Sequence, residues 1–275
     1  MKKQLKIEME RALHSRGFWI SLLVGMVIVT AQLIADVYPR GLNPLKGYTG
    51  QTDTPCTVFG WWIGGISDAY RETYMLVLPV LAVLPYGLSY QQDLKSGYIK
   101  NLYTRTKKIY YLTAKYATVF FMAGLTVVIP YLFNLLVTSC MLPAIKPSLM
   151  GARPVCATSI FYRLQMSHPY WYIGIYLLMM FVYAGTFATT ALAAASLVEN
   201  AFLLTLVPFV IWYGMNMISL YVKNWIGCSI NPMSMLQGYS GVSINNAAAW
   251  VLIPLLIGGV SAVIYFRNGV KSDAL

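Results

Sequence analysis

The sequence predicts an all-α polytopic membrane protein. Three observations support that prediction: the composition, the long uncharged segments and the uneven distribution of basic residues. Hydrophobic residues make up 58% of the 275 residues, and charged residues only 11%. A soluble domain usually carries about 25% charged residues. Because so few charges cannot cover a water-facing surface, lipid must solvate much of this chain.

Long apolar segments give the expected spans. A helix that crosses a hydrocarbon core of about 30 Å needs roughly 20 mainly apolar residues. The segments that meet this requirement are residues 17–36, 73–92, 116–141, 170–197, 200–222 and 247–266. We therefore expect six transmembrane helices in one domain over residues 1–275, with both termini on the same side. Pro79 and Pro85 predict a kink in the second span.

The basic residues predict the orientation of these spans. If the N-terminus is cytoplasmic, thirteen of the 20 Lys and Arg residues fall inside, although the outer connections are longer. Such a bias is the positive-inside pattern of a multi-pass membrane protein, and it predicts that both termini are cytoplasmic. It also accounts for most of the net charge of +11. We therefore expect membrane lipid, and no nucleic acid, around this chain.

The sequence lacks the motifs of several catalytic and nucleotide-binding sites. No GxxxxGK[ST], HExxH or GxSxG motif occurs, and the chain has only two histidines. These absences predict no catalytic site, no bound cofactor and no metal site in this chain. Asp36 closes the first expected span, and the spans contain no other Asp or Glu. This argues against an ion-coupled carrier, because such carriers often place an ionisable group inside the membrane.

Four cysteines fall in or beside the expected outer connections: Cys56, Cys140, Cys156 and Cys228. An oxidising exterior permits disulfides. Four cysteines allow three complete pairings, and the sequence does not choose among them. Four free thiols are the alternative interpretation.

The N-terminal segment 1–16 predicts an amphipathic helix in the inner interface. Leu5, Met9, Ala12 and Leu13 recur at helical spacing on one face, and charged residues occupy the rest. A frayed cytoplasmic tail is the alternative.

The cytoplasmic segment 91–115 joins the second and third spans. It begins with a helix-like run, breaks at Gly97 and ends with basic residues that lead into the next span. A solvated basic loop is one interpretation. The segment is long for a turn and mixes apolar residues with its charges, so we favour a helix that docks a cytoplasmic partner.

This order of segments resembles the permease subunit of an ABC-2 type ABC transporter. In that family, an interfacial helix precedes the first span. The connection between spans two and three carries an acidic residue, a glycine, a short helix and a basic stretch before a YLxAK sequence. The similar residues here are Asp93, Gly97, 98–102, 105–108 and 111–115. The Asn-Pro pair at 231–232 and the aromatic–Arg tail at 265–267 are also similar to the family's.

The resemblance implies the transmembrane subunit of an ATP-driven exporter in a bacterial cell membrane. Such a subunit pairs with a second copy or a related permease and docks two ATPase subunits, which bind the ATP and Mg²⁺. The implied substrate is an amphiphile such as an antimicrobial peptide or a drug. Residues 91–115 would form the coupling segment, of which 91–105 would transmit closure of the ATPases to the spans. The implied ATPase-docking residues are Asp93, Leu94, Gly97, Tyr98, Ile99, Leu102 and Arg105.

Polar residues inside the spans are candidates for a translocation path or for helix packing. They include Asn134, Thr186, Thr190 and Asn216. Each hydrogen bond between membrane helices contributes about 0.6–2 kcal/mol. The sequence alone leaves both roles open. It also leaves two other functions as alternatives: a secondary ion-coupled carrier, and a membrane scaffold or sensor that transports nothing.

Overall fold

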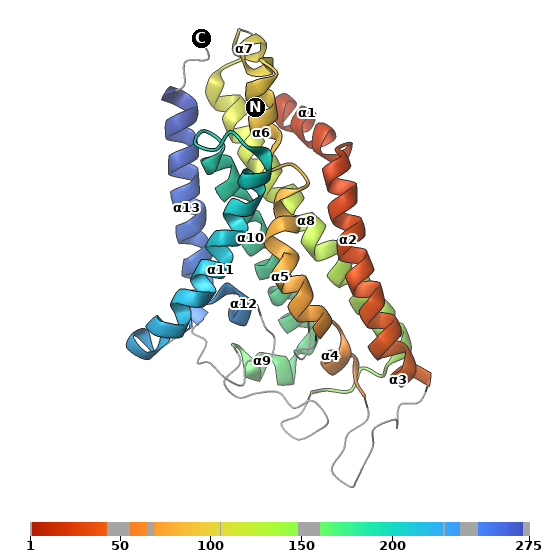
Figure 1. Cartoon of the computed structure of the whole chain (residues 1–275). Helices are drawn as coiled ribbons and strands as arrows, with labels where there is room; N and C mark the ends of the chain where they lie inside the picture. The colour runs from red at the N-terminus through yellow and green to blue at the C-terminus, as the bar shows by residue number, and fades with distance from the viewer. Residues whose placement is uncertain are drawn as a thin grey trace.

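The computed structural model describes residues 2–42, 56–64, 69–104, 106–147, 160–227, 229–236 and 247–271. Within these ranges the secondary structure is helical, without strands. Figure 1 shows an elongated bundle. The helices α1 (Lys2–Leu13), α6 (Ser89–Lys95) and α7 (Tyr98–Tyr103) lie at one end of it, together with the C-terminal end of α13 (Ala247–Lys271). We call this end the α6–α7 end.

Five helical stretches among the described residues are long and apolar enough to cross a membrane: Arg16–Leu42, Lys108–Met141, Pro169–Ala194, Ala201–Val222 and Ala247–Val270. The first combines α2 (Arg16–Gln32), the π-helical turn η1 (Leu33–Val37) and α3 (Tyr38–Leu42). The others lie in α8 (Lys108–Met141), α10 (Pro169–Ala194), α11 (Ala201–Ile226) and α13. The chain is therefore an all-helical, multi-pass membrane protein.

Four shorter helices complete the described structure. They are α4 (Val58–Trp61), α5 (Ala69–Val83), α9 (Tyr162–Ser167) and α12 (Pro232–Met235). In Figure 1, α3, α4, α9 and α12 gather at the end of the bundle opposite α7. The long helices connect the two ends.

The predicted second span, residues 73–92, is not one continuous helix. Helix α5 ends at Val83, a turn covers 84–88, and α6 follows. Pro85 lacks the N–H that would continue the helix, and its ring disfavours helical backbone at the preceding residue. At about 1.5 Å per residue, the 15 residues of α5 reach only about 22 Å.

Hydroxyl groups of the first span satisfy the backbone that this break leaves open. The Leu81 carbonyl would accept from residue 85 in a continuous helix, and here it accepts a 2.6 Å hydrogen bond from Ser21 Oγ. Ser15 Oγ donates to the Pro85 carbonyl at 2.7 Å. Ser15 also caps the N-terminus of α2, where its Oγ accepts from the Phe18 N–H. The first span therefore holds the turn in place.

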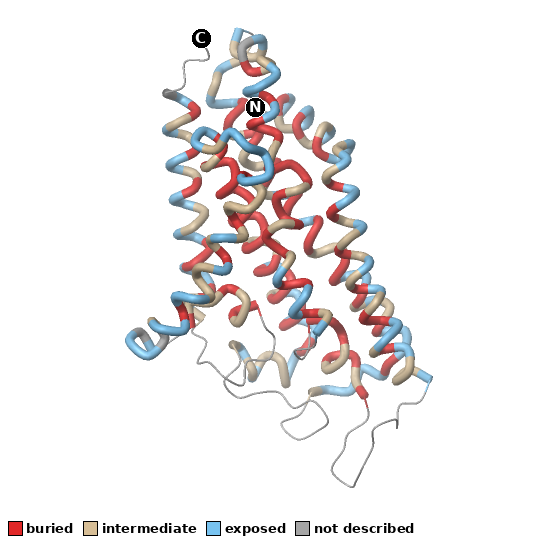
Figure 2. The backbone as a smooth tube through the Cα atoms, viewed as in Figure 1, coloured by how far each residue is buried: buried red, intermediate tan, exposed pale blue. Residues whose placement is uncertain are grey.

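The core lies along α10 and the inner face of α8, and Figure 2 shows buried residues concentrated in the middle of the bundle. Two glycines bring these helices together. A Cβ at Gly124 would lie 2.4 Å from the Phe181 ring, and one at Gly185 would lie 2.6 Å from the Phe120 ring. Each helix therefore seats an aromatic ring over a glycine of the other, which is the close approach that small residues allow in lipid. In contrast, α2, α11 and α13 expose many large apolar side chains.

Gly17 provides a test of the contact between the first span and the 84–88 turn. A Cβ at Gly17 would lie 2.1 Å from the Leu84 carbonyl oxygen, so Gly17→Ala should destabilise the protein by about 1–3 kcal/mol. The measurement is thermal unfolding in detergent. Gly214→Ala is the matched control, because a Cβ there meets nothing within 4 Å and alanine favours a helix. Equal melting temperatures for the two variants would contradict this contact.

Candidate functional site

A cluster of buried charged residues lies near the α6–α7 end, where α1, α6 and α8 meet. We call Glu8, Arg11, Asp93 and Lys115 the ionic cluster. The Lys115 side chain is fully buried, and its Nζ lies 2.8 Å from Glu8 Oε2 and 2.5 Å from Asp93 Oδ2. An unpaired charge at such a position would cost several kcal/mol, so these contacts determine how the three helices pack.

Arg11 completes the charge balance of the ionic cluster. Its guanidinium lies 2.8 Å from Asp93 Oδ1 and 3.1 Å from Glu8 Oε1. Two cations therefore face two carboxylates, and the cluster is formally neutral. Each carboxylate bridges both cations, so loss of any one member leaves an uncompensated charge in a buried position.

Two tyrosine hydroxyls bind the carboxylate oxygens of the cluster. Tyr111 Oη donates to Asp93 Oδ2 at 2.7 Å, and Tyr86 Oη donates to Glu8 Oε2 at 2.7 Å. The Arg11 guanidinium also lies 4.7 Å from the centre of the Tyr98 ring, a cation–π contact with the first residue of α7. The cluster therefore contacts both helices that follow the break at Pro85.

The pKa shifts on α1 and α6 agree with this pairing. Burial alone would raise the pKa of Asp93, but the hydrogen bond from Arg11 and the charge of Lys115 outweigh it, so the pKa lies below its ordinary value. Burial alone would lower the pKa of Arg11, and the hydrogen bond to Asp93 reverses the shift. Both groups are therefore charged at neutral pH.

The face of α1 that packs against the bundle carries polar side chains as well as an apolar one. Gln4, Glu8 and Ala12 are buried, whereas Leu13 is 42% exposed. The apolar residues alone do not determine this face, because the carboxylate of Glu8 pairs with Lys115. A sequence signal for this arrangement exists: Lys115 stands alone at the beginning of a long apolar run, and such a lysine needs an acidic partner.

The sequence-predicted docking residues separate into an anchored and an exposed group. Asp93 belongs to the ionic cluster, and Ile99 is only 2% exposed. Tyr98 and Leu102 are half-buried, and Leu94 is exposed. Together with Asn101 and Thr104, Tyr98 and Leu102 line an open depression of about 490 Å³ on α7. Arg105 lies outside the described residues.

Gly97 redirects the chain between α6 and α7. Its φ of 69° is left-handed, a conformation that glycine adopts without the Cβ penalty of other residues. Gly97 is the N-cap residue of α7, and this left-handed conformation occurs at that position. This turn lets α6 stay packed on the ionic cluster while α7 presents Asn101 and Thr104 to the exterior.

Helix α6 also contacts the connection between α10 and α11. Gln91 Nε2 donates to the Val198 carbonyl at 2.6 Å, and Lys95 Nζ donates to the Glu199 carbonyl at 2.7 Å. The Tyr90 ring packs edge-on against Tyr265 of α13, with 5.1 Å between the ring centroids, a spacing that aromatic pairs prefer. The short helix α6 is therefore tied to α1, α8, α13 and the α10–α11 connection.

The polar residues predicted inside spans have different roles. Asn134 donates to Gln32 Oε1 and accepts from the Ile63 N–H, both at 2.8 Å, so it fastens the segment 56–64 to α2 and α8. Asn216 Oδ1 accepts from Asn231 Nδ2 at 2.7 Å and joins α11 to the start of α12. These two residues pack elements together.

Thr186 and Thr190 instead bond within their own helix. Their hydroxyls donate to the Tyr183 and Phe187 carbonyls at 2.9 and 2.7 Å. A neighbouring cluster that the sequence analysis did not single out joins three helices: Tyr116 Oη of α8 donates to the Gly258 carbonyl of α13 at 3.0 Å and lies 3.3 Å from Thr189 Oγ1 of α10.

The cysteines and acidic residues form no further site among the described residues. Cys56 is a buried free thiol and Cys140 an exposed one. Cys156 and Cys228 lie outside the described residues. Across the described part of the chain, no group of three His, Cys, Asp or Glu side chains is arranged to hold a metal ion.

Comparison with known proteins adds no family assignment. No protein-family model matches the chain, and no curated protein matches it. Its function therefore has to be argued from the geometry of the site.

Lys115→Met should destabilise the protein by about 3–5 kcal/mol, because it leaves two carboxylates with only Arg11 to neutralise them. Adding Glu8→Gln should recover part of this loss, since Arg11 and Asp93 then form a neutral pair. Unfolding in mixed micelles measures both effects. The control Lys107→Met removes an exposed lysine at the start of the same helix and should change stability by less than about 0.5 kcal/mol. Additive losses in the double variant would contradict the pairing.

Asp93→Asn tests the lowered pKa of this carboxyl. Because the folded pKa lies below the unfolded value of about 3.9, ionised Asp93 stabilises the protein fully above that value. This stabilisation is lost as the pH falls through the folded pKa. The difference in melting temperature between wild type and Asp93→Asn should therefore be constant from about pH 8 to 5 and shrink below about pH 4. A difference that persists unchanged to pH 3 would show that the carboxylate charge is not responsible.

Proposed function

We propose that this chain is the transmembrane subunit of an ATP-driven exporter of the ABC-2 type, and that α7 docks a separate cytoplasmic ATPase. The observation that supports this most directly is the construction of the α6–α7 end. Helix α7, which is exposed on one side, follows a short helix that is fastened by buried ion pairs to α1 and α8. A solvated loop that only fixes the membrane topology needs no such anchor. A docking helix that transmits force to the spans needs one.

The proposed topology has six spans with both termini cytoplasmic in the cell membrane. Helix α5 is too short to cross alone, and we propose that α5, the 84–88 turn and the start of α6, up to residue 92, together make the second crossing. Ser21 of the first span binds the Leu81 carbonyl just before this turn, and Ser15, which caps that span, binds the Pro85 carbonyl within it. These bonds support its placement inside the protein at membrane depth. The α6–α7 end then faces the cytoplasm, in agreement with the basic residues of segment 91–115.

The contacts of α6 suggest how ATPase movement would reach the spans. Displacement of α7 would be passed to α6, and the ionic cluster would carry α1 and α8 with it. The bonds of Gln91 and Lys95 would carry the same displacement to the α10–α11 connection. Export requires two states of the transporter that differ in their contacts. A stiff α6 would couple ATPase docking at α7 to the arrangement of the spanning helices in these two states.

The remaining parts of the proposal follow from the family resemblance. A second permease copy or a related permease would complete the translocation path. Two ATPase subunits would supply ATP and Mg²⁺ chemistry, which this chain would not perform. The proposed substrate is an amphiphile, such as an antimicrobial peptide or a drug, taken from the membrane or its surface.

The ionic cluster also favours a second candidate, an ion-coupled carrier. Glu8, Asp93 and Lys115 are buried ionisable groups, which proton-driven carriers use. However, the charges of the cluster neutralise one another, and Asp93 has a pKa below its ordinary value. Proton coupling would require a group that titrates near neutral pH. Transport that collapses with the proton gradient while ATP is maintained would favour the carrier.

Copurification tests the docking proposal. Asn101→Asp with Thr104→Asp adds two negative charges to the exposed side of α7 and should abolish copurification of a P-loop ATPase from native membranes. Lys3→Asp is the control, because it changes the charge equally at an exposed position of α1. The protein should remain folded in both variants, as judged by its melting temperature. If no ATPase accompanies the wild type under conditions that preserve other membrane complexes, the exporter proposal fails.

A further inference from the structure

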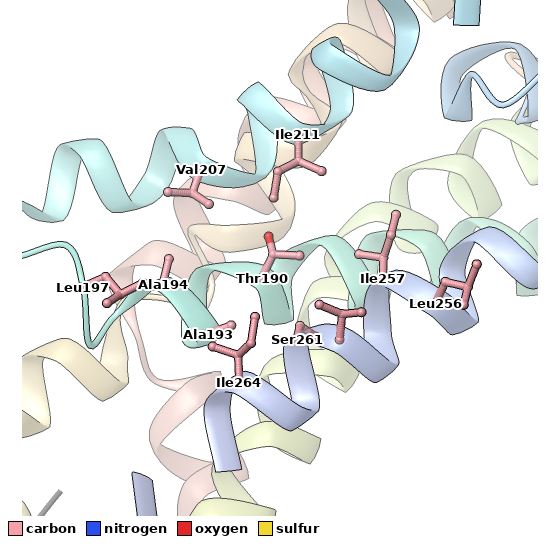
Figure 3. A pocket seen from close by; sticks show the side chains of 11 residues that line it. Thr190, Ala193, Ala194, Leu197, Val207, Ile211, Leu256, Ile257, Ser261 and Ile264 are labelled. Atoms are coloured by element: carbon pink, nitrogen blue, oxygen red, sulfur yellow. The ribbon is translucent and has the colours of Figure 1, made fainter. Parts of the chain in front are cut away.

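An apolar groove runs between α11 and α13 over the surface of α10. Its volume is about 410 Å³. Figure 3 shows side chains of these three helices pointing into a common space. Its polar lining residues, Thr190 and Ser261, have their hydroxyls bonded to the Phe187 and Gly258 carbonyls of their own helices. The groove therefore presents hydrocarbon to whatever fills it.

Small residues form the base of the groove, and large ones form its walls. Ala193 and Ala194 line it from α10, whereas Ile211 stands on α11 and Leu256 and Ile264 on α13. The adjoining surfaces of both wall helices are exposed and apolar, and Val210 and Val263 are 64% and 67% exposed. In a membrane these surfaces face lipid, so the groove opens toward acyl chains. An unfilled groove would forfeit dispersion contacts along its walls.

The groove ends in polar and cationic groups. Arg267 and Asn268 lie one helical turn beyond Ile264, on the same face of α13. Asn268 Nδ2 donates to Ser196 Oγ at 2.9 Å, next to Leu197 of the groove lining. Arg267 is exposed, and no carboxylate among the described residues pairs with it.

The charges near this end of the groove favour an anion. Arg267 and Lys95 carry positive charge there, and Glu199 carries negative charge. Lys95 reaches this connection through its bond to the Glu199 carbonyl. The balance is one net positive charge at the level where a phospholipid headgroup would lie. An apolar cleft that ends in a cation and two hydrogen-bonding side chains matches the chemistry of one lipid molecule.

We propose that this groove binds one acyl chain of an anionic phospholipid, with the headgroup phosphate beside Arg267, Asn268 and Ser196. The bound lipid would act as a wedge between α11 and α13, whose direct packing is slight compared with their packing on α10. This site goes beyond the proposed exporter function and does not depend on it, since it requires neither an ATPase nor a transported substrate.

Lipid binding by the purified, delipidated protein tests the proposal. Detergent-solubilised protein is titrated with dioleoyl phosphatidylglycerol or dioleoyl phosphatidylcholine, and bound lipid is counted by native mass spectrometry. We expect one phosphatidylglycerol per chain to bind more tightly than phosphatidylcholine. Arg267→Gln should weaken phosphatidylglycerol binding about fivefold, the effect of one cation at an anionic lipid surface. It should weaken phosphatidylcholine binding less, because the choline cation of that lipid offsets the charge of its phosphate. Arg16→Gln, an exposed arginine on α2, should have no effect.

Filling the groove tests the position of the acyl chain. Ala194→Phe should abolish the selective binding, and Val207→Trp on the opposite wall serves as a second variant if the first does not fold. Val27→Phe, on the exposed face of α2, is the matched control. Equal affinity for the two lipids, or unchanged binding in both groove variants, would overturn the proposal. A change of oligomeric state on groove filling, with lipid binding unchanged, would assign the groove to a second copy of the chain instead.

Discussion

The burial of Lys115 is the constraint on which the α6–α7 end of the bundle depends. An ammonium with no exposed surface needs carboxylate partners, and the chain supplies one of them, Glu8, from 107 residues earlier. This pair brings the N-terminal helix against α8. Asp93 then joins from α6, and Arg11 balances the second carboxylate. Three helices are held together by a set of charges that is stable only when complete.

The break at Pro85 is what allows Asp93 to take part. In a straight continuation of α5, α6 would keep the axis of α5, but the turn at 84–88 separates the two. The carbonyls of Leu81 and Pro85 still accept hydrogen bonds, which Ser21 and Ser15 donate. A proline that removes a helical hydrogen bond and a neighbouring helix that restores it form one structural unit. The proposed transmission from α7 depends on this unit being rigid.

The two ends of the molecule fix their short helices and turns by different interactions. At the α6–α7 end, ion pairs do so. At the opposite end, the amides of Gln32 and Asn134 bind the backbone of segment 56–64. Between the ends, glycines and aromatic rings pack α8 against α10. The wall helices α11 and α13 remain open to lipid, and the proposed lipid site lies where their packing leaves a groove.

The sequence by itself determined the fold class and the positions of five long helices, because hydropathy over about 20 residues is a local property of the chain. It also placed the turn at Gly97, which only the backbone freedom of glycine permits. The tertiary structure decided the buried face of α1, the division of segment 73–92 and the packing role of Asn134. Each of these depends on partners distant in sequence: Glu8 on Lys115, Leu81 on Ser21, Asn134 on Gln32. Local spacing cannot reveal such pairs, because burying a polar group becomes favourable only when its partner arrives from another helix.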